Sequence, residues 1–114
     1  MPPSSSAYLG EFEQLVLLSI LRLGPEAYGV TIGRELEERA NRTVSRGALY
    51  TTLDRLEDKG FLRWKLAPGG DARGRVPRRS YTVTPRGVAA LRAQQHVLGR
   101  MWRGLEGVLG DEPQ

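Results

Sequence analysis

Apolar residues recur with a helical period over the first sixty residues of the chain. Between Gly10 and Leu23 they would cover most sides of a helix, which Gly24-Pro25 would end. Apolar residues spaced by three and four predict two further helices, over residues 28–40 and 45–59. Ser45 is a favourable N-cap for the third helix. Because a helix that is apolar on most sides must be covered on most sides, the first helix favours a partner subunit.

After residue 60 the period changes from 3.6 to 2. Leu62, Trp64 and Leu66 alternate with basic residues, and the alternation resumes over residues 80–84. The intervening residues 68–77 are rich in glycine and proline. Two alternating segments around such a connection predict a β-hairpin in which each strand has one face on the core.

Thr84-Pro85 predicts the start of a last helix, with threonine as the cap and proline at the first helical position. Its apolar residues follow a heptad spacing that extends to Leu109. We therefore expect one continuous helix that pairs with the same helix of a second copy. The residues expected in the dimer interface are Leu17, Leu91, Leu98, Trp102 and Leu105.

The predicted order is helix, helix, helix, hairpin, helix. This fold class is mainly α with a small β-hairpin, namely a winged helix-turn-helix followed by a C-terminal dimerisation helix. The expected organisation is a disordered N-terminal tail over residues 1–8, a winged-helix domain over 9–84 and the dimerisation helix over 85–110.

The charge is distributed unevenly along the chain. The formal net charge is +4, but residues 1–44 carry −2, residues 45–86 carry +6 and residues 87–114 are neutral. A basic segment of this kind is typical of a phosphate-binding face, and it is equally compatible with a solvated surface.

Three stretches of the sequence resemble the PadR family of bacterial transcriptional regulators. They are Tyr28-Gly29, the segment Ser45-Arg46-Gly47-Ala48-Leu49-Tyr50 continuing to Leu62, and the segment from Arg78 to Gly87. The short C-terminal part resembles the smaller subfamily, which has a single helix after the wing. The resemblance implies a homodimer that represses nearby genes from a palindromic operator.

The third helix divides into an apolar face and a polar face. Its N-terminal half is the part that usually meets base edges in the major groove. Arg46 is suited to guanine, Thr51 to a base or a thymine methyl group, and Tyr50 either to a phosphate or to packing. The candidate DNA-binding residues of this helix are Ser45, Arg46, Tyr50, Thr51 and Arg55.

Four arginines lie in or beside the predicted hairpin connection: Arg73, Arg75, Arg78 and Arg79. Arginine is suited to phosphate contacts and to narrow minor grooves. The same charges could instead protect an exposed strand edge from aggregation. Their position after a helix-turn-helix pattern favours DNA contact.

The sequence offers no catalytic residues, metal ligands or cofactor motif. It has no cysteine, and its single histidine, His96, lies on the last helix without a nucleophile beside it. Without an apolar run of membrane-spanning length or a signal peptide, we expect a cytoplasmic protein that is neither an enzyme nor membrane-bound.

Leu98 and Trp102 are also the candidate residues for an effector site. A flat aromatic or cationic compound could stack on Trp102 between two subunits. The tryptophan of the family pattern aligns near Leu98, one turn earlier, which favours Trp102 as a plain interface residue over a ligand platform. An alternative function is a winged-helix protein-interaction module without DNA binding, but this alternative does not explain the basic middle segment.

Overall fold

The computed structural model describes residues 8–67 and 78–110. Two of the wing arginines, Arg73 and Arg75, and most of the predicted N-terminal tail lie outside these ranges. The elements are helices α2 (Glu11–Leu23), α3 (Gly29–Ala40), α4 (Arg46–Asp58), α5 (Pro85–Trp102) and α6 (Glu106–Leu109), the 3₁₀ turn η1 (Gly24–Glu26), and strands β1 (Leu62–Leu66) and β2 (Arg79–Val83).

The helices begin and end at the residues whose chemistry favours those positions. Ser45 Oγ accepts a hydrogen bond from the Ala48 amide (3.1 Å), and Thr84 Oγ1 accepts one from the Gly87 amide (3.1 Å). Asn41 ends α3 in the left-handed conformation, with φ of 57°. The caps expected at Ser45 and Thr84 are therefore confirmed.

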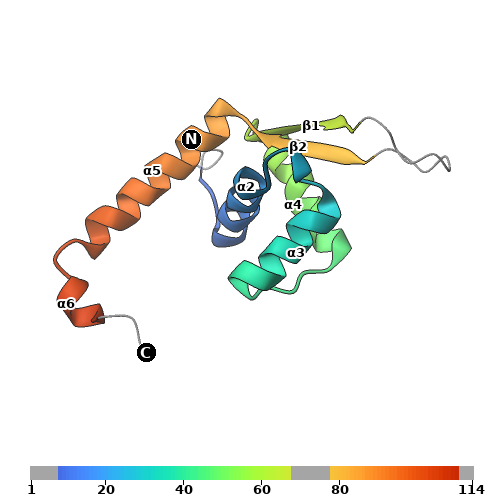
Figure 1. The fold of residues 1–114 in the computed structure, drawn as a ribbon. Coiled ribbons are helices and arrows are strands. Elements are labelled where there is room, and N and C mark those ends of the chain that lie inside the picture. Colours follow the sequence, from blue (N-terminus) through green and yellow to red (C-terminus); the bar gives the residue numbers. More distant parts are fainter. Residues whose placement is uncertain (1–7, 68–77, 111–114) are drawn as a thin grey trace.

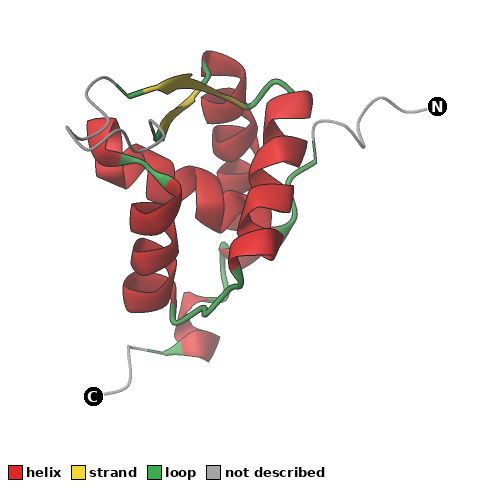
Figure 2. Ribbon diagram, turned by 90° about the vertical axis from the view of Figure 1, so that its right-hand side faces the viewer, coloured by secondary structure: helices red, strands yellow, loops and turns green. Residues whose placement is uncertain are grey.

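The two strands form an antiparallel sheet that lies across one end of the helical bundle (Figure 2). Trp64 is paired with Tyr81, and Leu62 with Val83. The sheet is tied to the helices by the Tyr81 amide, which donates to the carbonyl of Ala27 (2.9 Å), just after η1. This bond fixes the base of the wing between α2 and α3.

The core lies under the sheet and between α2, α3 and α4. Leu17, Ile32, Leu53 and Phe61, one from each helix and one from the start of the wing, are less than 2 % exposed. A mainly helical chain with three packed helices and a two-stranded wing confirms the winged helix-turn-helix fold expected from the sequence.

Helix α5 leaves this core on the side opposite the wing (Figure 1). Its first turn is held by Thr84, whose hydroxyl donates to the Gly60 carbonyl (2.7 Å) and whose amide donates to the Phe61 carbonyl (3.0 Å). Gly87 packs directly on that joint, where an added Cβ would lie 2.3 Å from the Phe61 carbonyl oxygen. The absence of a side chain at Gly87 is thus what allows α5 to pack closely against Phe61.

Two sequence predictions about the dimer surface are wrong. The last helix does not continue to Leu109, because it ends at Trp102 and Gly104 turns the chain at φ of +87° before α6. Leu17 is fully buried in the core of its own protomer, and Leu91 is only 9 % exposed. Neither the heptad spacing of the last helix nor the apolar character of the first distinguishes a core position from a subunit interface.

Candidate nucleic-acid interface

Helix α4 presents one polar face to solvent. Leu49, Leu53 and Leu56 point into the core, as expected for the inner face. Four of the predicted DNA-binding residues on this helix are exposed, namely Ser45, Arg46, Thr51 and Arg55. The face therefore has a cationic, hydroxyl-bearing surface at the helix N-terminus, where base contacts are usually made.

Tyr50 is half-buried and packs between this face and the start of α3. A Cβ at Gly29 would lie 2.0 Å from Tyr50 Oη and 2.7 Å from Cζ, so the ring edge sits directly on the Gly29 backbone. The ring of Tyr50 packs against Gly29, and its hydroxyl lies at the N-terminal end of α3. The two roles considered for Tyr50, packing and phosphate contact, are therefore compatible. In the sequence analysis Gly29 was part of the family resemblance without a structural reason; the structure shows that its missing side chain leaves room for the Tyr50 side chain.

Arg78 brings the base of the wing to the same place. Its guanidinium lies over the Tyr28 ring, with Cζ 4.1 Å from the ring centroid. Tyr28 is the N-cap residue of α3. The hairpin, through Arg78, and α4, through Tyr50, thus converge on Tyr28-Gly29.

Arg79 is placed differently from Arg78. Its guanidinium stacks on the Trp64 ring, with Cζ 4.0 Å from the centroid. The indole Nε1 of Trp64 in turn donates to Glu57 Oε1 on α4 (3.1 Å). Both arginines are exposed and both stack on a ring, but only the ring under Arg79 is hydrogen-bonded to α4.

Tyr81 lies beneath the wing with its side chain buried. Burial raises the pKa of its hydroxyl above the usual value, and the nearby positive charge of Arg79 opposes that rise. Among the described residues, Tyr81 Oη has no hydrogen-bond partner, so Arg79 lies near it without bonding to it.

A second, apolar surface lies on α5 and α6, away from the basic face. Its side chains range from 47 % to 80 % exposed. The helix break at Gly104 brings α6 back so that both helices line one apolar groove of about 350 Å³. The residues of this groove, here called the C-terminal patch, are Leu98, Met101, Trp102, Leu105, Val108 and Leu109.

The C-terminal patch continues toward α2. A groove of about 540 Å³ between α2 and α5 is lined by Leu18, Leu21, Leu98 and Trp102, together with Arg92. Leu18 and Leu21 are 44 % and 46 % exposed, so these are the exposed leucines of α2. For the dimer interface, the sequence predicted Leu17, which is buried, and not the exposed Leu18 beside it.

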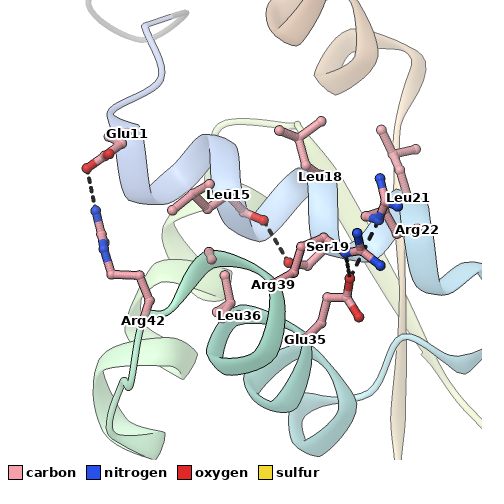
Figure 3. A pocket seen from close by; sticks show the side chains of 11 residues that line it. Glu11, Leu15, Leu18, Ser19, Leu21, Arg22, Glu35, Leu36, Arg39 and Arg42 are labelled. Carbon is pink, nitrogen blue, oxygen red and sulfur yellow. Dashed lines mark hydrogen bonds and ion pairs between the residues drawn. The ribbon is translucent and has the colours of Figure 1, made fainter. Parts of the chain in front are cut away.

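Leu18 and Leu21 also line a groove of about 610 Å³ between α2 and α3, shown in Figure 3. Its charged side chains are paired with one another: Glu35 accepts from Arg39 (2.6 Å) and lies 3.5 Å from Arg22, while Glu11 pairs with Arg42. Three arginines and two glutamates leave one net positive charge, but each arginine is paired with a carboxylate, so the groove lacks a strongly charged centre.

The residues described by the structure contain no group of three or more histidine, cysteine, aspartate or glutamate side chains placed to bind a metal ion. Within the same ranges, none of the helices combines the length and the apolar character needed to cross a membrane.

The model of the transcriptional regulator PadR-like family matches residues 17–93 of the chain. The chain belongs to this family. The match runs from the second half of α2 to the first half of α5, so it includes α3, α4 and both strands, the elements that build the basic face. Family membership makes the protein a transcriptional regulator rather than an enzyme, as the absence of catalytic motifs led us to expect.

Solved structures show the same fold. A PadR-like transcription factor from Bacteroides fragilis is 26 % identical, with 85 % of this chain and 88 % of that chain covered and a TM-score of 0.67. The hsRosR-S4 protein, solved as a complex, is 29 % identical over 88 % of this chain and 80 % of its own, with a TM-score of 0.65. Bacillus subtilis PadR in complex with operator DNA is 22 % identical, covers 75 % of this chain and 48 % of its own, and has a TM-score of 0.60. No curated protein matches the chain.

Proposed function

We propose that this regulator is a cytoplasmic repressor that binds a palindromic operator as a homodimer. The observation that carries the proposal is the convergence of α4, the proposed recognition helix, and the wing on Tyr28-Gly29, through Tyr50 and Arg78. Arg46 and Thr51 are exposed on the same helix. A basic helix N-terminus beside a basic wing is the arrangement that fits a major groove and its flanking phosphates. The related PadR structure with operator DNA has the same fold.

The C-terminal patch supports the homodimer. Six large apolar side chains exposed together are unfavourable in a monomer and are typical of a subunit interface. In a two-fold dimer the two α4 helices would enter successive major grooves about 34 Å apart, which requires an inverted repeat in the DNA.

The experiment that tests DNA reading is a salt titration of binding to operator and scrambled duplexes. We expect Arg46→Ala and Thr51→Ala to cost about 1–3 kcal/mol on the operator and little on scrambled DNA, because base contacts carry discrimination. Arg78→Ala should weaken both complexes alike and reduce the salt slope by about 0.9, because it removes one phosphate contact. Tyr50→Phe keeps the ring on Gly29 but removes the hydroxyl, so we expect its affinity for DNA to fall without loss of the fold.

The opposite pattern would reverse these roles. If Arg46→Ala lowered both affinities equally while Arg78→Ala changed sequence preference, the helix would be the phosphate clamp and the wing would read the bases. Equal binding of the unmodified protein to both duplexes would instead favour a protein-interaction module.

The groove between α2 and α5 is the proposed place for an effector. Trp102 and Leu98 give it an aromatic and apolar wall, and Arg92 favours a neutral or anionic aromatic compound over a cationic one. We expect such a compound to quench Trp102 fluorescence in a Trp64→Phe background and to raise the melting temperature. If neither signal changes across a panel of neutral, anionic and cationic aromatic compounds, the regulator has no effector at this groove.

A further inference from the structure

Trp64 connects the wing to the recognition helix through two contacts. On one side its Nε1 donates to Glu57 Oε1 in the last turns of α4 (3.1 Å). On the other, the Arg79 guanidinium covers its ring at 4.0 Å. Glu57, Trp64 and Arg79, here called the tryptophan link, thus join α4, β1 and β2 in one chain of side-chain contacts.

The strand register explains why Arg79 reaches the ring. Trp64 lies opposite Tyr81, and Arg79 lies opposite Leu66, so all four side chains are on one face of the sheet. That face turns toward the helices at Tyr81, which is 2 % exposed. Arg79 therefore lies on the inward-turned face, whereas Arg63 and Lys65 alternate onto the other face and are exposed.

Two arginines adjacent in sequence consequently have different surroundings. Arg78 stacks on Tyr28 beside the N-terminus of α3, next to the corner where the proposed DNA face is built. Arg79 stacks on a side chain that is itself hydrogen-bonded to α4, and its charge is felt by the buried Tyr81 hydroxyl.

We propose that Arg79 is a positioning residue, and that the tryptophan link holds the wing at a fixed orientation to α4 so that both engage DNA as one unit. This inference rests on the proposed DNA binding and refines it, because it separates Arg79 from Arg78 in function. Planarity of the guanidinium, rather than its charge, is then the property that position 79 requires.

The salt dependence of operator binding distinguishes a positioning residue from a phosphate clamp. Arg79→Lys keeps the charge but loses the planar stack, and Arg79→Ala loses both. We expect each variant to weaken operator binding about two- to fivefold, with the salt slope unchanged. A clamp would give the opposite result: Arg79→Lys would bind as the unmodified protein does, and Arg79→Ala would lower the slope by about 0.9.

Two variants at Glu57 supply a test with matched charge. Glu57→Gln keeps an oxygen that can accept from the indole, whereas Glu57→Leu does not, and both remove the same negative charge. The account predicts that operator affinity is higher for Glu57→Gln than for Glu57→Leu. Equal affinities would show that the hydrogen bond to Trp64 does not position the wing.

A measurement without DNA tests the link separately from the proposed function. In a Trp102→Phe background Trp64 is the single tryptophan, and the Arg79 guanidinium shields one face of its ring. We expect Arg79→Ala and Arg79→Lys to increase quenching of Trp64 fluorescence by acrylamide, while Arg78→Ala leaves it unchanged. If Arg79→Ala leaves quenching unchanged, the link is wrong even if the protein binds DNA. If quenching rises but no DNA binds, the DNA-binding function fails while the stack itself stands.

Discussion

Replacing Leu98 and Leu105 together by aspartate is expected to convert the proposed homodimer to folded monomers and to abolish tight operator binding. The two leucines are 50 % and 47 % exposed in the protomer, so aspartate can be accommodated in a monomer. In a dimer the same carboxylates would be buried without partners, which is strongly unfavourable. Because each monomer then binds its half-site independently, the affinity for the operator should fall about 100-fold or more.

Sedimentation equilibrium of the free protein and anisotropy with labelled operator measure the two parts of this prediction. Ala89→Asp is the matched control, since residue 89 is half a helical circumference from Leu98 on α5 and is not among the residues lining the described grooves. The prediction is contradicted if the double variant remains dimeric, or if the unmodified protein is monomeric at micromolar concentration.

Among the glycines that the structure describes, Gly87 is the one at which substitution by alanine is expected to cause the largest loss of stability. The new Cβ would lie 2.3 Å from the Phe61 carbonyl oxygen and 2.8 Å from the Val83 side chain. The carbonyl belongs to the backbone and is itself bonded to the Thr84 amide, so it cannot move without breaking the joint between wing and α5. We expect a loss of about 3 kcal/mol or more in the free energy of unfolding.

Urea unfolding of the DNA-free protein measures this loss. Gly47→Ala on α4 is the control: a Cβ there meets no atom within 4 Å, and the substitution should stabilise the helix by up to about 1 kcal/mol. Equal stability of Gly87→Ala and the unmodified protein would show that α5 is not packed on Phe61 as described.

Local chemistry made much of the fold predictable. Ser45, Thr84 and Asn41 act at helix ends through their own hydrogen bonds or backbone conformation, so their positions can be read without tertiary information. The change of period at Leu62 likewise indicates a strand because alternation reflects one buried face. The polar face of α4 follows from the same reasoning.

The rest depended on tertiary packing. Leu17 and Leu18 are neighbouring leucines, and the sequence does not distinguish them. Only the packing of α2 against the core shows that Leu17 is buried and Leu18 exposed. The break after Trp102 was readable in principle from Gly104, but the heptad spacing continued across it. That Arg78 and Arg79 rest on different aromatic rings could not be read from two adjacent arginines, because those rings come from distant parts of the sequence.

The central claim is that two copies of the chain read an inverted repeat, and its most direct test is a mobility shift with DNA from upstream of the regulator's own gene. We predict a complex of two protomers per duplex, formed at nanomolar concentration and at least about 10³-fold more tightly than with a scrambled duplex of equal length and composition. Moving the two half-sites apart by half a helical turn should abolish this complex, because the two half-sites would then lie on opposite sides of the DNA and the two α4 helices could not reach both. Equal affinity for upstream and scrambled DNA, or a complex that tolerates the altered spacing, would contradict the claim.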